Sequence, residues 1–201
     1  MTTPAYLVFR TTLARALLVA ALAVLTGGCV AIAAGGAATG ASMANDRRTA
    51  GTFIDDQGIE LKAAKAIVED EELKAQAHIN VTSYNFIVLL TGEVPTEALR
   101  ERVVDIVRKL PKVKHVYDEL AIAAPSSMVS RSSDSLITAK VKTQLFALTD
   151  FDATRVKVVT ERGTVFLMGL TKSAEADRAT ETARTVGGVQ KVVKLFEMLD
   201  E

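Results

Sequence analysis

The chain has 201 residues and carries 24 basic and 24 acidic side chains, which give a formal net charge of zero. A neutral chain lacks the basic excess with which nucleic-acid-binding domains approach phosphates. Its single cysteine excludes an intramolecular disulfide, so the fold must rest on a hydrophobic core. The length allows one domain or two small ones.

The N-terminal residues have the pattern of a secretory signal peptide. Arg10 and Arg15 precede an apolar run, ALLVAALAVL, at residues 16–25. Such a run is typical of a signal peptide and is too short to span a bilayer core, which needs about 20 residues. We therefore predict a signal peptide at residues 1–28. Its removal takes away two arginines and no acid, which leaves a mature chain with a formal net charge of −2.

The only cysteine, Cys29, follows this segment directly. A lone cysteine is often a small core residue, and a cysteine nucleophile would need a histidine partner. The flanks favour a third interpretation, because an apolar run, small residues and a cysteine together resemble a bacterial lipobox. The resemblance implies that Cys29 becomes the acylated first residue of the mature protein, and several acyl chains anchor a protein stably. Val30, where an aspartate would retain the protein elsewhere, implies sorting to the outer membrane, facing the periplasm.

A segment rich in alanine and glycine follows, and we interpret residues 29–55 as the acylated cysteine and a flexible tether. Beyond it the sequence nearly repeats itself. INVTSYNFIVLLTG (residues 79–92) aligns with VKVVTERGTVFLMGL (residues 156–170), and KVKHVYDELAI (residues 112–122) aligns with GVQKVVKLFEM (residues 188–198). Two similar modules are therefore expected rather than one large domain.

Each copy shows a helical apolar period, two β-branched runs, a second helical stretch and a closing apolar run. This order predicts an α+β fold of two αββαβ modules, at residues 56–123 and 134–201, with a linker at residues 124–133. Each module is expected to hold a three-stranded mixed sheet with both helices on one face. Asp55 or Asp56 is expected to cap the first helix of the first module, and Ser133 or Asp134 that of the second.

A tight turn is expected between the first two strands of each module. Gly163 can adopt a positive φ in the second copy. Phe86 takes its position in the first copy, so Asn85, which tolerates a positive φ, is expected to carry that turn. The predicted core comprises Ile67, Ile79, Val81, Val88 and Leu90 in the first module and Ile137, Val141, Val158, Val165 and Leu167 in the second.

At VKVVTERGTVFLMGL and GGVQKVV the second module resembles the BON domain, and INVTSYNFIVLLTG and PKVKHV carry the resemblance more loosely in the first. With the lipobox, the tether and the stretch DRR-x-x-GT-x-x-DD-x-x-IE (residues 46–60), the chain resembles the dual-BON outer-membrane lipoproteins of Gram-negative bacteria. The resemblance implies a non-enzymatic envelope protein. It also implies association with anionic phospholipid through the first helix of the second domain, and a role in keeping the outer membrane intact.

Four residues of that helix form the predicted phospholipid-binding site: Leu136, Lys140, Lys142 and Phe146. An apolar tip beside ammonium groups suits the boundary between acyl chains and anionic headgroups. Leu136 stands where better-known relatives have a tryptophan, so binding is expected to depend more on the lysines. The alternative is that Leu136 staples the helix start and the lysines form an ordinary solvated face. The protein would then be a periplasmic scaffold or chaperone-like adaptor that contacts an envelope assembly protein.

The sequence offers no enzymatic signature. The two histidines, His78 and His115, lie in predicted strands without a nucleophile–base or metal-binding motif around them. The acid pairs Asp55-Asp56 and Glu71-Glu72 are interpreted as caps and solvated turns. We therefore expect no catalytic residue, no metal, no cofactor, no small-molecule substrate and no nucleic-acid partner.

Overall fold

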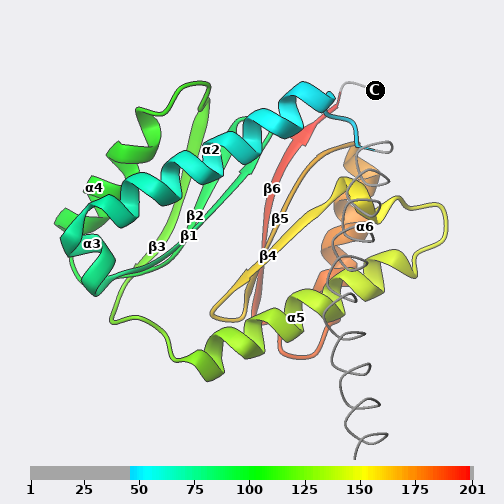
Figure 1. Cartoon of the computed structure of the whole chain (residues 1–201). Helices are drawn as coiled ribbons and strands as arrows, with labels where there is room; N and C mark the ends of the chain where they lie inside the picture. Colours follow the sequence, from blue (N-terminus) through cyan, green and yellow to red (C-terminus); the bar gives the residue numbers. More distant parts are fainter. Residues whose placement is uncertain (1–45, 200–201) are drawn as a thin grey trace, which may run out of the picture. The chain divides into compact units, whose positions relative to one another are not determined.

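The computed structural model describes residues 46–199 (Figure 1). The predictions for the signal peptide, Cys29 and most of the tether fall outside these residues. Among the described helices, none is both long and apolar enough to cross a membrane.

Two copies of the same element order make up the described chain. The first contains α2 (Ala50–Glu69), α3 (Glu71–Gln76), β1 (His78–Tyr84), β2 (Ile87–Val94), α4 (Glu97–Arg108) and β3 (His115–Ile122). The second contains α5 (Met128–Phe146), the 3₁₀ turn η1 (Ala153–Arg155), β4 (Lys157–Glu161), β5 (Thr164–Thr171), α6 (Ser173–Arg184) and β6 (Lys191–Met198). Apart from the short α3 and η1, both copies follow the predicted αββαβ order.

Each module has its own three-stranded sheet, with the second strand in the middle. The hairpin strands pair antiparallel, β1 with β2 and β4 with β5. The closing strand pairs parallel to the central one, β3 with β2 and β6 with β5, because a helix carries the chain back to the start of the sheet. The predicted α+β class and mixed sheets are confirmed.

Each module buries one face of its sheet under its two helices. Val88 and Leu90 of β2 pack with apolar residues of α2 and α4, and Val165 and Leu167 of β5 pack with those of α5 and α6. All five core residues predicted for the second module are buried. In the first module Ile67, Val88 and Leu90 are buried, whereas Ile79 and Val81 are partly buried against the same cluster.

The first helix of each module starts earlier than predicted. Thr49 caps α2 and Ser127 caps α5, so the predicted caps were wrong. Asp56 and Asp134 lie within the helices instead, and their side chains are buried. Helix α5 consequently includes most of the predicted linker.

The two buried aspartates bind the hairpin turns. Asp56 accepts hydrogen bonds from the backbone N–H groups of Asn85 and Phe86 at 2.8 and 2.9 Å. Asp134 accepts equivalent bonds from Arg162 and Gly163, both at 2.9 Å. All four turn residues have positive φ, between 50° and 72°, as a type I′ hairpin turn requires. The predicted role of Asn85 is confirmed, and Phe86 shares it. A buried carboxylate on each first helix thus fixes the helix to its sheet.

The faces of the two sheets that carry no helix share a third apolar cluster. Tyr84 and Leu89 come from the first module, and Phe166, Met168 and Leu195 from the second. The sheets remain separate, as predicted, but the modules share buried surface that the sequence analysis did not predict. Each isolated module would expose these side chains to water, which opposes folding of the modules one at a time.

Candidate membrane-binding site

Helix α5 has one buried side and one solvent-facing side. Asp134, Ile137, Val141 and Leu145 are buried against the second module. The large apolar residues that α5 exposes are Met128, Val129, Leu136 and Phe146. Leu136 and Phe146 are 63% and 64% exposed, so neither is a core residue. Met128 and Val129 were missed because their segment was interpreted as linker.

Two lysines flank the exposed apolar residues. At about 100° per residue, Leu136 and Phe146 lie about 80° apart around α5, with Lys140 just beyond Leu136 and Lys142 just beyond Phe146. Both lysines are exposed. Within the described part of the chain neither makes an ion pair. The structure therefore brings all four predicted residues to one solvent-facing side.

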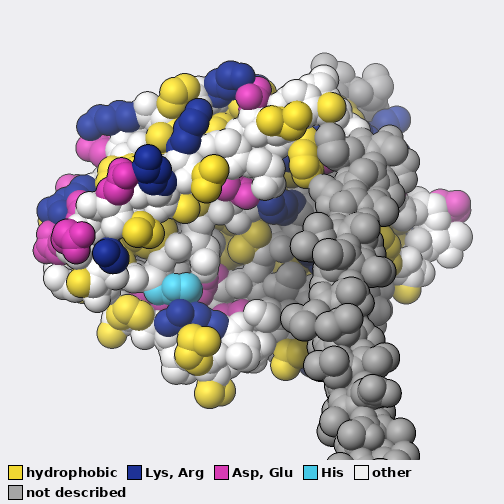
Figure 2. Space-filling model, viewed as in Figure 1, with side chains coloured by type: hydrophobic (Ala, Val, Ile, Leu, Met, Phe, Trp, Pro, Cys, Tyr) yellow, Lys and Arg dark blue, Asp and Glu magenta, His cyan; other side chains and the backbone are white. Residues whose placement is uncertain are grey.

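The charge of α5 is one-sided. The helix carries Arg131, Lys140 and Lys142 against one acid, Asp134, whose carboxylate is buried in its hairpin bonds. On the face shown in Figure 2, hydrophobic side chains occur in small groups interspersed with charged and other polar ones. Such a surface suits contact with a charged interface rather than a large dry protein interface.

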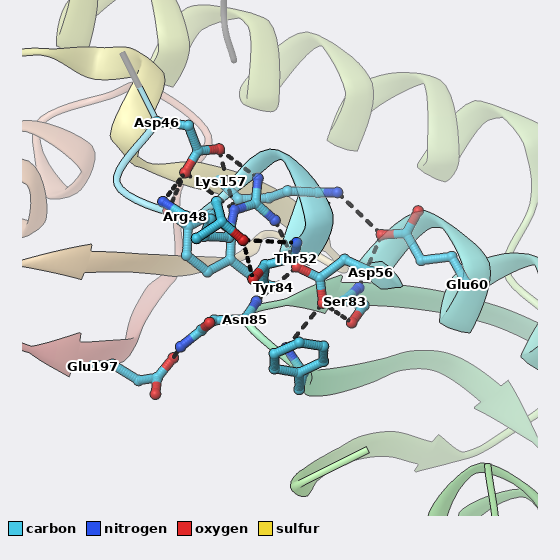
Figure 3. Close-up of polar contacts among 12 residues, drawn as sticks. Asp46, Arg48, Thr52, Asp56, Glu60, Ser83, Tyr84, Asn85, Lys157 and Glu197 are labelled. Atoms are coloured by element: carbon cyan, nitrogen blue, oxygen red, sulfur yellow. Dashed lines mark hydrogen bonds and ion pairs between the residues drawn. The ribbon is translucent and has the colours of Figure 1, made fainter. Parts of the chain in front are cut away.

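Two adjacent arginines precede the first module, and each contacts a different module. Arg48 is almost fully buried and pairs with Asp46 at 2.6 Å and with Asp56 at 2.8 Å (Figure 3). Its guanidinium also lies 3.8 Å from the centre of the Tyr84 ring. Burial by itself would lower the pKa of Arg48, but the hydrogen bonds that its guanidinium donates to Asp46 and Asp56 raise it overall. Burial raises the pKa of Tyr84 to about 12.

The neighbouring Arg47 binds the second module. Its guanidinium binds both carboxylate oxygens of Glu175 at 2.6 and 2.8 Å and donates to the backbone carbonyl of Leu170 at 2.8 Å. The Arg47 bond lowers the pKa of Glu175. Consecutive arginines thus hold different modules. The sequence analysis quoted this DRR stretch as part of a resemblance and did not assign its contacts.

Further polar contacts cross between the modules. Lys157 pairs with Glu60 at 3.1 Å, and Asn85 donates to Glu197 at 2.9 Å, both in Figure 3. With the shared apolar cluster, these contacts hold α5 in a defined orientation to the first module. The solvent-facing side of α5 therefore has a fixed position relative to the first module.

One group of side chains in the described residues has the composition of a metal site. A nitrogen of His78 and carboxylate oxygens of Glu93 and Glu161 all lie within 4.8 Å of one another. His78 lies directly opposite Glu93 across the β1–β2 pair. Only glycine fits at the adjoining position 92, because a Cβ on Gly92 would collide with the His78 carbonyl. The sequence analysis missed this group, since residues 78, 93 and 161 form no spacing motif.

Comparison with known proteins identifies the family. The chain matches the BON domain at residues 55–124 and 133–200. It is 39% identical over 173 residues to the outer membrane lipoprotein DolP of Haemophilus influenzae. The aligned region covers 86% of this chain and 90% of that protein. It is 41% identical to the 21 kDa hemolysin of Actinobacillus pleuropneumoniae, over 75% of this chain and 78% of that protein. It is 32% identical to the osmotically-inducible protein Y of Escherichia coli, over 71% of this chain and 72% of that protein. The chain therefore belongs to the dual-BON family of outer-membrane lipoproteins.

Proposed function

We propose that this protein is an outer-membrane lipoprotein, acylated at Cys29 and facing the periplasm, that binds anionic phospholipid through α5 and supports the integrity of the envelope. One observation carries the lipid-binding proposal. The solvent-facing side of α5 presents Leu136 and Phe146 between two unpaired lysines, and the only acid of the helix is buried. No enzymatic activity is part of the proposal.

The physical fit is with a headgroup boundary. Leu136 and Phe146 can enter the boundary between headgroups and acyl chains, while each lysine near an anionic surface contributes about 1 kcal/mol. Because no described side chain neutralises Lys140 or Lys142, no internal ion pair must break before they bind phosphate. Leucine lacks the preference of tryptophan for the membrane interface, so binding should weaken strongly with salt.

Vesicle co-sedimentation tests the proposal with residues 30–201, which contain every residue of the three core clusters. Phosphatidylglycerol vesicles should bind the wild type at low salt and release most of it at high salt. Lys140→Glu/Lys142→Glu should weaken binding at least about 30-fold, because two lysine contributions of about 1 kcal/mol are lost. Leu136→Glu should also weaken binding.

The equivalent helix of the first module supplies matched controls. Lys62→Glu/Lys65→Glu and Leu61→Glu change exposed residues of α2 in the same way. These variants should bind vesicles like the wild type. If the α5 variants stay folded and bind as well as the wild type, or if the α2 variants lose equal affinity, α5 is not the membrane contact.

Acylation has its own test. Mass spectrometry of the N-terminal peptide of the mature protein should show an acylated Cys29, and Cys29→Ala should accumulate as an unprocessed precursor. Cleavage elsewhere, or an unmodified thiol, would remove the anchor from the proposal without affecting the α5 experiment.

A specific observation keeps the adaptor function as a second candidate. A groove of about 450 Å³ lies between α2 and the edge strand β1, lined by Leu61, Ala64, Val68 and Val81 among others. An apolar groove beside an unpaired strand edge can accept an extended peptide. The α2 variants above test this function too, because Leu61→Glu places a charge in the groove and should weaken binding of an assembly protein but not of vesicles.

A further inference from the structure

The group His78, Glu93 and Glu161 lies where the two modules meet, and its two carboxylates are buried. His78 and Glu93 belong to the first sheet, and Glu161 ends β4 of the second. Glu93 is 1% exposed and Glu161 is 6% exposed. Two carboxylates held this close and away from water repel each other unless a proton or a cation lies between them.

The surrounding residues do not neutralise these carboxylates. In residues 46–199 neither Glu93 nor Glu161 pairs with a lysine or an arginine. Glu93 Oε2 accepts a hydrogen bond from the backbone N–H of Ser126 at 3.1 Å, but its Oε1 is buried with no partner. A buried carboxylate oxygen without a donor is costly, so this atom calls for a ligand.

The second carboxylate is in a similar position. Glu161 Oε2 accepts one hydrogen bond, from the Asn80 side-chain amide at 2.9 Å, and the same amide nitrogen lies 3.3 Å from His78 Nε2. The buried Glu161 thus lies beside a second buried carboxylate, Glu93. The site thus favours an added positive charge.

We propose that His78, Glu93 and Glu161 bind a zinc-type divalent cation that cross-links the two BON modules. One imidazole and two carboxylates form a donor set that suits zinc and similar first-row metals, whereas magnesium and calcium prefer oxygen ligands throughout. Zinc bonds of about 2.0–2.2 Å place neighbouring ligand atoms about 3.3–3.5 Å apart, so the three groups need to close by about 1 Å.

The site has a route for the ion and for a fourth ligand. A cleft of about 270 Å³, lined by Gly92, Glu161, Arg162 and Phe166 among others, adjoins it, and Asn80, which donates to Glu161, is exposed. Water from the cleft can complete four-coordination. Because the ligands come from both modules, an ion bound only by the folded protein stabilises their association by mass action.

Isothermal titration of metal-free, tag-free residues 30–201 with zinc chloride tests the proposal. This segment contains no cysteine and only two histidines, so few competing sites exist. We expect one zinc per chain and a melting temperature that rises with zinc. His78→Gln, Glu93→Gln and Glu161→Gln should each weaken zinc binding at least about tenfold, given that even outer ligand partners are worth about 10–100-fold. Calcium chloride should bind more weakly than zinc.

His115→Gln is the matched control, because His115 is exposed on β3, lies against Tyr117 and is not part of the group. It should bind zinc like the wild type. Each glutamine variant keeps the size of its side chain, and its circular dichroism spectrum without metal shows whether it is folded. Wild-type protein that binds no stoichiometric zinc, or His78→Gln that binds as tightly as the wild type, overturns the proposal. If, in addition, Glu93→Gln raises the metal-free melting temperature, the group holds a shared proton instead.

Discussion

Helices α2 and α5 occupy the same place in the two modules but differ in charge and in their contacts. Helix α2 carries four acidic and two basic residues, and α5 carries one acidic and three basic residues. Aligned on Asp56 and Asp134, the Leu136 position corresponds to Gly58 and the Lys142 position to Ala64, whereas Lys140 corresponds to Lys62 and Phe146 to the exposed Val68. Of the four residues proposed to bind lipid, Leu136 and Lys142 are thus specific to the second module.

The acids of α2 are engaged within the protein. Asp56 binds Arg48, Glu60 binds Lys157, and Asp55 binds Lys112 at 2.7 Å. The single acid of α5, Asp134, binds the β4–β5 hairpin of the same module. Within the described residues, Lys140 and Lys142 make no ion pair. The acids of α2 are therefore used in contacts within the protein, whereas the lysines of α5 face solvent.

Removing the buried aspartates should show this difference most strongly. Asp56→Ala leaves the buried Arg48 side chain without one of its two acids and the hairpin without its acceptor. The substitution should therefore lower the free energy of unfolding by about 3–5 kcal/mol. Asp134→Ala removes only the hairpin acceptor and should lower the free energy of unfolding by about 1–3 kcal/mol. Urea unfolding measures both. Equal losses would mean that the Arg48 pair adds nothing to the first module.

Matched core substitutions test whether the modules unfold together. Val88→Ala and Val165→Ala trim equivalent residues that are fully buried, and each should reduce the free energy of unfolding by about 1–3 kcal/mol. In residues 30–201 both tyrosines, Tyr84 and Tyr117, lie in the first module. If the shared cluster couples the modules, Val165→Ala should shift the tyrosine fluorescence transition and the circular dichroism transition equally. A tyrosine transition unchanged from wild type would show independent modules.

The hairpin turns offer a smaller contrast. Gly163 has φ 72°, and a Cβ there would lie 2.9 Å from the Gln190 side chain. Gly163→Ala should therefore destabilise the protein by about 1 kcal/mol, measured by thermal unfolding. Arg162→Gly, which relaxes the other left-handed residue of the same turn, is the control and should not destabilise through backbone strain. A Gly163→Ala protein as stable as the wild type would show that the turn can shift.

The smallest effect concerns the two adjacent arginines. Arg47→Gln breaks an ion pair whose side chains are 20% and 24% exposed, and should cost about 0.5–1 kcal/mol near neutral pH. Because Arg47 holds the pKa of Glu175 below its unfolded value, this contribution is present above the unfolded pKa and is lost as the pH falls through the folded pKa. Wild type and variant should therefore converge in stability in acid. A difference that stays constant with pH would assign the loss to packing rather than charge.

The local pattern of the chain was sufficient for much of this fold. Alternating apolar residues such as Val165 and Leu167 identified strands, the helical spacing of Ile137 and Val141 identified a buried stripe, and the repeat identified two modules. These features follow from side-chain periodicity, which a sequence displays directly. The exposure of Leu136 and Phe146 was predictable for the same reason, because the core stripe of α5 leaves them on the other side.

The tertiary structure decided what depends on distant residues meeting. Asp56 and Asp134 look like helix caps locally, and only the hairpins 28 to 30 residues further on turn them into buried acceptors. The continuous apolar runs of β2 and β5 held a signal for burial on both faces, but not the identity of the second face, which is the other module. His78, Glu93 and Glu161 meet for the same reason: strand register places the first two opposite each other, and the packing of one module on the other brings the third, which no pattern within a single segment encodes.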